Sequence, residues 1–225
     1  MYRLVTTTAF EPRNAVLINT RPTVFVVDDD ISIRESLEML ITEAGWQPEL
    51  FQSASAFLAQ PKPLTPHCLI LDVNLPDLNG IDLQTRMAAC GRAATMPIIF
   101  ITGRGDIRTT VRAMKAGALE FFTKPFDHDI LLSAVDDALK RSSAALSEAV
   151  ELDTLRQLYE SLSVREREVM CLVIKGLLNK QVGSALGISE ITVKAHRGRV
   201  MRKMQARSLA DLVVMAAKLP LTGTA

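Results

Sequence analysis

The sequence has few cysteines and no long apolar stretch, and each absence excludes a class of protein. Its three cysteines, Cys68, Cys90 and Cys171, are widely spaced, and no Cys-x-x-Cys pair occurs. This pattern predicts reduced thiols and argues against a disulfide framework or a zinc site. No apolar run reaches about 18 residues, and residues 1–20 contain no continuous hydrophobic segment, so we expect neither a membrane span nor a secretory signal. The expected location is therefore cytoplasmic, with no membrane partner.

Charge is unevenly distributed along the chain. The formal net charge is +1 over 225 residues, yet residues 163–218 contain eleven Lys or Arg against four Asp or Glu. The C-terminal part is therefore basic and the rest acidic. The length allows one large domain or two small ones. This asymmetry favours two, the second of which faces nucleic acid.

Residues 22–141 alternate five short β-rich runs with helical patterns. Such alternation predicts right-handed βαβ units and a parallel sheet. Ser32 begins a capping-box pattern for the first helix, and Asp106 and Asp127 are positioned to cap two later helices. Gly45 is placed to end the first helix. The segment is therefore expected to be an α/β domain.

Two further segments lack the signals of a separate domain. Residues 1–21 show no periodicity and no capping signal, and we expect a disordered tail or a misplaced start codon. Residues 142–160 contain neither Gly nor Pro, and their leucines have loose helical spacing. This composition favours a helical linker.

Residues 161–225 hold four short helical patterns. Residues 179–205 are typical of a helix, a short Gly turn and a second helix, which fits a helix-turn-helix. Four polar residues are the candidate N-caps of these helices: Ser163, Asn179, Ser189 and Ser208.

Polar residues end four of the predicted strands. Asp28 and Asp29 follow an apolar run, as does Asp72, while Thr102 and Lys124 end two later runs. In an open α/β sheet, ligands bind outside the carboxyl ends of the strands, so these side chains should meet in one crevice. Three carboxylates repel one another unless a cation lies among them. The pattern therefore indicates Mg²⁺ and a phosphoryl group.

The same residues suggest a reaction. The carboxylate of Asp72 could act as a nucleophile and form an aspartyl phosphate, while Mg²⁺ shields the developing charge. Lys124 would pair with one phosphoryl oxygen, and Thr102 could donate a hydrogen bond to another. A phosphatase of the haloacid-dehalogenase type is a rival, but it needs an acid two residues after the nucleophile, where this chain has Asn74. No Gly-rich phosphate loop occurs either, so we do not expect an enzyme with steady turnover.

Residues 22–141 resemble the receiver domains of two-component response regulators. The resemblance rests on four segments in order and at matching spacing: VVDDD at 26–30, LDVNLPDLNG at 71–80, FITG at 100–103 and FTKPF at 122–126. It implies a flavodoxin-like, five-stranded parallel sheet with Asp72 as the phosphoacceptor. The residues that it implies as Mg²⁺ ligands are Asp28, Asp29, Asp72 and the main-chain carbonyl of Asn74.

The resemblance also implies a conformational switch. Asp72, Thr102 and Lys124 would form the catalytic set, and Thr102 and Phe121 would be the switch residues, although Phe121 could equally be plain core packing. The Lys124–Pro125 peptide bond is expected to be cis. Val111 and Lys115 would lie on the face through which the phosphorylated protein dimerises.

Residues 160–218 resemble the LuxR/FixJ/NarL-type helix-turn-helix domain. The resemblance rests on residues 162–169, 176–180, 186–189 and 192–196. Val193, Val200 and Met204 should face the core, so that Lys194, Arg197, Gly198 and Met201 point outward. His196 could contact a phosphate or pack beside the turn, and packing is the preferred interpretation. The residues expected to contact DNA are Asn179, Lys180, Thr192, Lys194, Ala195, Arg197, Arg202, Lys203 and Arg207.

Two glycines depart from the pattern of that family. Gly183 stands where a bulkier residue or alanine is usual, and Gly198 lies inside the recognition helix. A mid-helix Gly costs about 0.5–1 kcal/mol relative to Ala and offers no side chain for contact with bases. We therefore expect Lys194, Ala195 and Arg197 to carry base recognition.

Together the two resemblances imply a phosphorylation-activated transcription regulator. A sensor histidine kinase would phosphorylate Asp72, the protein would form a homodimer, and two output domains would bind double-stranded promoter DNA and engage RNA polymerase. The alternative is a DNA-binding regulator that is independent of phosphorylation and has a purely structural receiver.

Overall fold

The chain contains two compact units. A computed structural model describes residues 21–61, 63–103 and 105–219. The division between the units falls between Ser143 and Ala144. The tail predicted at residues 1–21 lies outside the described residues, apart from Arg21.

The first unit is built on a parallel sheet of five strands in the order β2-β1-β3-β4-β5. This order confirms the predicted receiver-type α/β fold. The strands are β1 (Thr23–Val27), β2 (Gln47–Phe51), β3 (His67–Asp72), β4 (Ile98–Thr102) and β5 (Glu120–Thr123). The helices that follow them are α1 (Ile31–Glu43), α2 (Ala54–Leu58), α3 (Gly80–Ala89), α4 (Ile107–Lys115) and α5 (His128–Glu160).

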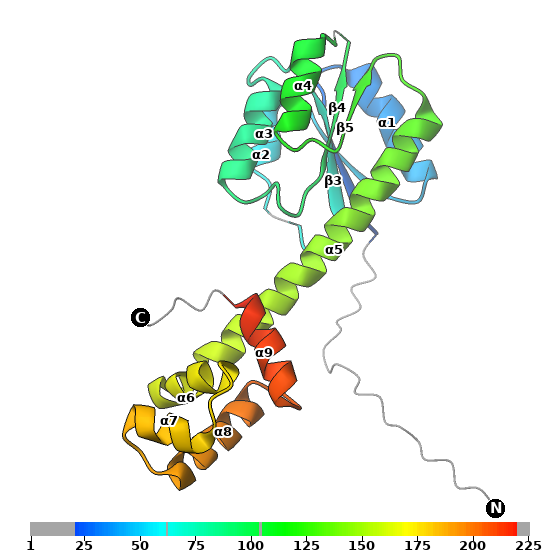
Figure 1. The fold of residues 1–225 in the computed structure, drawn as a ribbon. Coiled ribbons are helices and arrows are strands. Elements are labelled where there is room, and N and C mark those ends of the chain that lie inside the picture. Colours follow the sequence, from blue (N-terminus) through cyan, green and yellow to red (C-terminus); the bar gives the residue numbers. More distant parts are fainter. Residues whose placement is uncertain (1–20, 62, 104, 220–225) are drawn as a thin grey trace, which may run out of the picture. The chain divides into compact units, whose positions relative to one another are not determined.

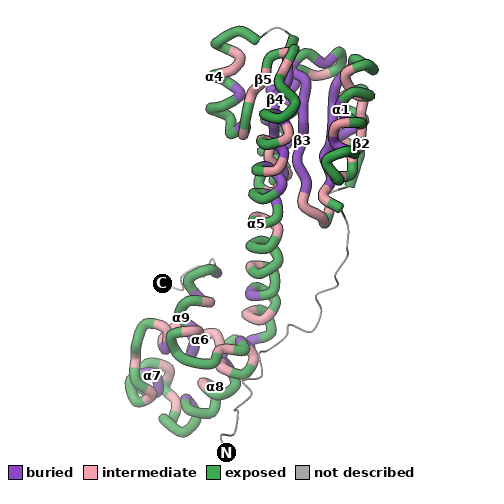
Figure 2. Tube along the Cα trace, turned by 90° about the vertical axis from the view of Figure 1, so that its right-hand side faces the viewer, coloured by how far each residue is buried: buried purple, intermediate pink, exposed green. Residues whose placement is uncertain are grey.

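Helices cover both faces of the sheet (Figure 1). One hydrophobic core lies between the sheet and α2, α3 and α4, and the other between the sheet and α1 and α5. Strands β1, β3 and β4 are buried along their whole length (Figure 2). A strand buried on both faces needs apolar side chains at every position. This requirement explains why these strands are continuous apolar runs that end in a polar residue.

Local capping fixes where the helices of this unit begin and end. The prediction that Ser32 caps α1 is wrong, because the helix begins at Ile31 and the side chain of Asp30 accepts from the Ser32 amide at 2.8 Å. The predicted caps Asp106 and Asp127 are confirmed, since each accepts from main-chain amides in the first turn of its helix. Gly45 ends α1 at φ +85°, a conformation that favours glycine.

Helix α5 continues beyond the first unit. Residues 142–160, predicted to be a helical linker, lie within this one helix. The part beyond Ser143 contributes Leu152, Leu155 and Leu158 to a core of the second unit. The end of α5 is therefore a structural element of that unit as well as a connection.

The second unit continues with α6 (Val164–Ile174), α7 (Asn179–Leu186), α8 (Glu190–Lys203) and α9 (Leu209–Lys218). Ser163, Ser189 and Ser208 each accept a bond from the first turn, as predicted, and Ser163 forms a full capping box with Glu166. Asn179 was wrongly predicted as a cap. Leu178 precedes α7 instead, and its amide donates to Gln181 Oε1.

Helices α7 and α8 form the predicted helix-turn-helix. Gly187 ends α7 at φ +65°. A Cβ on Gly183 would lie 2.7 Å from the carbonyl oxygen of Ile188, so the turn packs against α7 where only glycine fits. Within the described ranges, no helix combines the length and apolar composition needed to cross a membrane.

Candidate functional site

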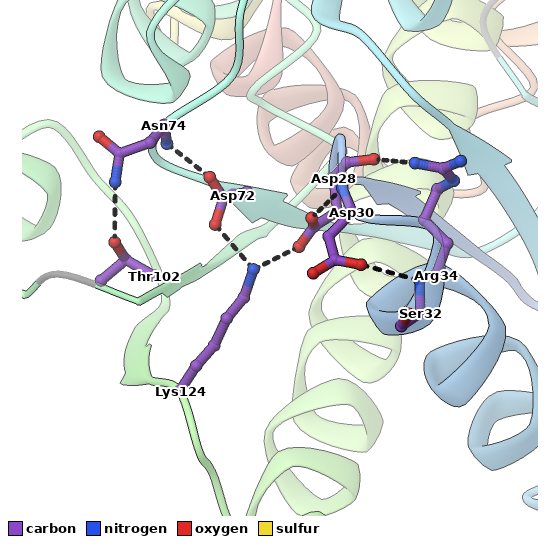
Figure 3. Close-up of polar contacts among 8 residues, drawn as sticks. All are labelled: Asp28, Asp30, Ser32, Arg34, Asp72, Asn74, Thr102 and Lys124. Carbon is purple, nitrogen blue, oxygen red and sulfur yellow. Dashed lines mark hydrogen bonds and ion pairs between the residues drawn. The ribbon is translucent and has the colours of Figure 1, made fainter.

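The polar residues that end the strands of the first unit lie together at one edge of the sheet (Figure 3). Asp28 follows β1, Asp72 ends β3, Thr102 ends β4 and Lys124 follows β5. Strands β1 and β3 are neighbours in the sheet, and the chain order reverses between them. Such a switch point is where open α/β sheets place their ligand sites.

Lys124 joins two of the carboxylates. Its Nζ donates to Asp28 Oδ2 at 2.6 Å and to Asp72 Oδ1 at 3.0 Å. Burial raises the pKa of Asp28, although the hydrogen bond and the charge of Lys124 oppose this effect. Burial acts to lower the pKa of Lys124, but the hydrogen bonds and charges of Asp28 and Asp72 outweigh it and the pKa is raised. The ammonium therefore stays charged and is the counter-ion of the site.

The main chain and a helix residue hold Asp28 in place. The Asp30 amide donates to Asp28 Oδ1 at 2.9 Å, and Arg34 Nη1 donates to the Asp28 carbonyl oxygen at 2.6 Å. Asp29, at the same strand end, is exposed. The sequence analysis missed Arg34, and only its place one turn into α1 could have suggested the contact.

Asp72 is almost fully buried, and its second oxygen is also bonded. The Asn74 amide donates to Asp72 Oδ2 at 2.6 Å, and Asn74 Nδ2 donates to Thr102 Oγ1 at 3.3 Å. The second contact links the ends of β3 and β4. Asn74 thus joins the predicted phosphoacceptor to the predicted switch hydroxyl, through its main-chain amide on one side and its side chain on the other.

The loop after β3 is tied down at two further points that the sequence analysis missed. Asp77 accepts from the Ala54 and Ser55 amides and from Ser55 Oγ at 2.7–3.2 Å, which anchors the loop to α2. A Cβ on Gly80 would lie 2.4 Å from the Asp72 carbonyl oxygen. The glycine therefore lets α3 begin directly against the end of β3.

The donor atoms at this edge fit a hard divalent cation. Carboxylate and main-chain carbonyl oxygens are the ligands that Mg²⁺ prefers, and buried Asp28 needs a positive partner. Among the described residues, no group of three His, Cys, Asp or Glu side chains is arranged to hold a metal ion. The Lys124 ammonium lies between Asp28 and Asp72 instead. The oxygen atoms at this edge have the chemistry that Mg²⁺ requires, while the two buried carboxylates are bonded to the Lys124 ammonium.

Lys124 and Phe121 are positioned by their neighbours on β4 and β5. The Lys124–Pro125 bond is cis, as expected, and the Lys124 amide donates to the Thr102 carbonyl oxygen at 2.8 Å. Phe121 is half-buried and its ring lies 6.1 Å from that of Phe100. The packing expected of Phe121 is therefore present.

Helix α4 buries little of its surface. Ala113 is its one fully buried residue among those described. Val111 and Lys115, predicted to form a dimer face, are both exposed, and Met114 is exposed beside them. Arg108 and Arg112 are exposed on the same helix, so its surface combines apolar side chains with three cations.

Helix α8 has one side that faces the core of the unit and another that is exposed. Val193, Val200 and Met204 are buried, as predicted, while Lys194 and Ala195 are exposed. The prediction that Met201 points outward is wrong, because its side chain is half-buried and packs against a core of the unit. Further exposed members of the predicted DNA-binding set are Lys180, Thr192, Arg202 and Arg207.

Three members of the predicted DNA-binding set, Asn179, Arg197 and Lys203, form bonds inside the second unit. Arg197 is half-buried and its Nη1 donates to Asn179 Oδ1 at 3.1 Å, so it does not point fully outward as predicted. Lys203 donates to Glu166 at 2.6 Å and to the Ser161 carbonyl oxygen at 2.9 Å. The hydrogen bond from Lys203 is the main reason that the pKa of Glu166 is lowered to about 2. The ammonium of Lys203, predicted to contact DNA, thus joins α8 to the start of α6.

His196 packs within the unit. Its ring is half-buried, and Nδ1 is buried without a hydrogen-bond partner in the described part of the chain. This environment agrees with the expectation that it packs beside the turn.

Comparisons with known proteins agree with both units. Residues 24–136 match the response regulator receiver domain family, and residues 160–216 match the luxR family of bacterial regulatory proteins. Nodulation protein W of Bradyrhizobium diazoefficiens is 50% identical over 198 residues, which cover 88% of this chain and 86% of that protein. The transcriptional regulatory protein FixJ of the same organism is 42% identical over 200 residues, covering 88% and 96%.

A solved structure of the response regulator StyR matches with a TM-score of 0.80 and 46% identity, covering 89% of this chain and 100% of that one. Full-length FixJ from B. japonicum matches with a TM-score of 0.53 and 39% identity, covering 88% and 97%. The similarity thus spans both units, at identities that establish family membership. The chain belongs to the two-component response regulators and is a transcription regulator with a receiver domain and a luxR-type DNA-binding domain.

Proposed function

We propose that Asp72 accepts a phosphoryl group from a sensor histidine kinase and that this modification activates DNA binding. The observation that carries the proposal is the placement of Asp72. Its carboxylate lies at the end of a central strand, 3.0 Å from the Lys124 ammonium, with Asp28 on the other side of that ammonium. A nucleophile, a cation and a second acid thus share one edge of the sheet.

The transfer exchanges one bond to phosphorus for another. An oxygen of Asp72 forms a bond to phosphorus while the bond from phosphorus to the donor imidazole nitrogen breaks, and the imidazole leaves with the electron pair. Lys124 would then pair with a phosphoryl oxygen in place of Asp72 Oδ1, and Thr102 would donate to another. Bound Mg²⁺ would supply positive charge that shields the carboxylates and the phosphoryl oxygens.

The same residues support slow loss of the phosphoryl group. Asp28, Asp29, Asp72 and the main-chain carbonyl of Asn74 would hold Mg²⁺. The Asn74 side chain is an amide and donates to Thr102, so it offers no acid or base for hydrolysis. A regulator rather than a phosphatase therefore fits the site.

Activation would pass from Thr102 to Phe121 and α4. Thr102 would leave the Asn74 amide for the phosphoryl group, and Phe121, which packs on Phe100, would follow. The α4 surface with Val111 and Lys115 would then pair with its copy about a two-fold axis in a homodimer.

The dimer would present two DNA-binding domains to two half-sites of promoter double-stranded DNA. Helix α8 would lie in the major groove and contact base edges through Lys194 and Ala195. Cations around it would contact the phosphates. RNA polymerase is the expected partner of the bound dimer.

Acetyl phosphate with Mg²⁺ tests the phosphorylation site. The full chain should gain one phosphoryl group by intact mass, and peptide mapping should place it on Asp72. Asp72→Asn should abolish labelling, while Asp82→Asn, a matched change in the first turn of α3, should not. Labelling that survives Asp72→Asn would contradict the assignment.

Measurements of DNA affinity distinguish the proposal from the alternative, a regulator that is independent of phosphorylation. Affinity for duplexes selected from a random library should rise on labelling of the wild type and stay constant for Asp72→Asn. Equal affinity with and without labelling would support the regulator that is independent of phosphorylation. The intact acidic pocket, in which Lys124 contacts both Asp28 and Asp72, argues against that alternative.

A further inference from the structure

The outward face of α8 has an apolar centre. Val193 and Val200 are buried and define the side of the helix that faces the core. At about 100° per residue, positions 191, 195, 198 and 202 lie on the opposite side. Their occupants are Ile191, Ala195, Gly198 and Arg202, and all are exposed.

Ile191 is the large apolar group of this face. It is 82% exposed in the first turn of α8, after the N-cap Ser189. A single exposed aliphatic residue is ordinary on a protein surface. Here, however, the next two outward positions are Ala195 and Gly198, and a Cβ on Gly198 would meet nothing within 4 Å. The outward stripe from Ile191 to Gly198 is therefore a low, apolar surface that another molecule can approach closely.

Cations flank this surface, and a further cation, Arg197, bonds within the unit. Lys194 and Arg199 are exposed on either side of the outward stripe, and Arg202 continues it. Arg197 is half-buried and bonded to Asn179 on α7. An apolar strip bordered by positive charge is complementary to the floor and the phosphate walls of a DNA groove.

In the major groove, one group of the bases is suited to contact with an aliphatic side chain. Thymine alone presents a C5-methyl group there, and aliphatic residues recognise it by contact. Residues at the N-terminal end of a recognition helix are those that reach base edges. We propose that Ile191 contacts a thymine methyl group in each half-site, with Ala195 beside it, and that this contact makes the protein select thymine at that position.

This inference rests on the proposed placement of α8 in the major groove. The experiment uses the full chain and a duplex selected by the wild type from a random library. Each thymine in turn is replaced by deoxyuridine, which keeps the base pair and removes only the methyl group. For the wild type, one replacement in each half-site should lower affinity about three- to fivefold, the effect of one lost methyl contact. For Ile191→Ala, the same replacement should have no effect.

Two further variants act as controls. Val164→Ala removes another exposed aliphatic side chain, in the first turn of α6, and should keep the sensitivity to deoxyuridine. Ile191→Val should also keep it, because valine still offers methyl groups. Equal binding of all variants to a scrambled duplex would show that they are folded.

The outcomes separate this inference from the placement on which it rests. Interference by methylation of guanine N7 reports occupancy of the major groove. If methylation interferes but Ile191→Ala keeps the wild-type sensitivity to deoxyuridine, the role of Ile191 is overturned and the placement stands. A wild type that is insensitive at every thymine, or a selected site without thymine in its half-sites, also overturns the role. Absence of interference at every guanine overturns both.

Discussion

Replacing Lys124 by methionine should destabilise the first unit through its effect on Asp28. The ammonium lies 2.6 Å from Asp28 and 3.0 Å from Asp72, and Asp28 is fully buried. Removing one partner of a buried ion pair costs about 3–5 kcal/mol. The Lys124 side chain is 19% exposed, so water reduces this effect and we expect a loss near the lower limit, about 3 kcal/mol at pH 7.

The loss should depend on pH with a defined sign. Burial already raises the pKa of Asp28 above its ordinary value of 3.8, and removing Lys124 removes the contacts that oppose the rise. A carboxyl group whose folded pKa is raised contributes stability that is present below 3.8 and is lost as pH rises through the folded pKa. The deficit of Lys124→Met should therefore be small near that value and grow toward pH 7.

Urea unfolding of the full chain measures this difference. Trp46 is the only tryptophan of the chain and packs against a core of the first unit, so its fluorescence reports on that unit. Lys140→Met is the control, because Lys140 pairs with Asp136 on the exposed surface of α5 and should leave stability unchanged.

A second substitution tests the cause of the loss. Asp28→Asn combined with Lys124→Met removes the unpaired carboxylate and should restore part of the stability at pH 7. A deficit that is equal at pH 4 and pH 7, or a double variant that recovers nothing, would refute the reasoning.

Three other predictions follow from the described contacts. Lys115→Glu should weaken dimerisation of the phosphorylated chain in sedimentation experiments but leave labelling of Asp72 unchanged, and loss of labelling would place Lys115 elsewhere in the mechanism. Lys194→Ala should reduce the preference for a selected duplex over a scrambled one, whereas Arg202→Ala should weaken binding to both and flatten the salt dependence; equal loss on both duplexes for Lys194→Ala would contradict this. Gly80→Ala should cost about 1–3 kcal/mol and slow labelling, because the new Cβ would lie 2.4 Å from the Asp72 carbonyl oxygen, and an unchanged unfolding midpoint would disprove it.

The sequence by itself determined the fold class and most of the residues that meet at the candidate site. A strand buried on both faces is an apolar run, so the first polar residue after it marks the carboxyl edge of the sheet. This rule selected Asp28, Asp72 and Thr102 without any coordinates, whereas Lys124 was selected because it follows β5, which is only partly buried. The caps at Ser163 and Ser189 were equally clear, because a cap is a contact between residues three positions apart.

Only the tertiary structure decided which partner each polar side chain binds. The Lys124 ammonium lies between two acids that are 96 and 52 residues away in the chain. Arg197 bonds to Asn179 on another helix, and Lys203 joins α8 to α6, so two cations predicted to face DNA hold the unit together. Even the cap of α1 belongs to Asp30, since the backbone leaving β1 decides which side chain reaches the amide. Spacing along the chain fixes the face on which a side chain lies, whereas its bonds depend on distances between elements that only packing sets.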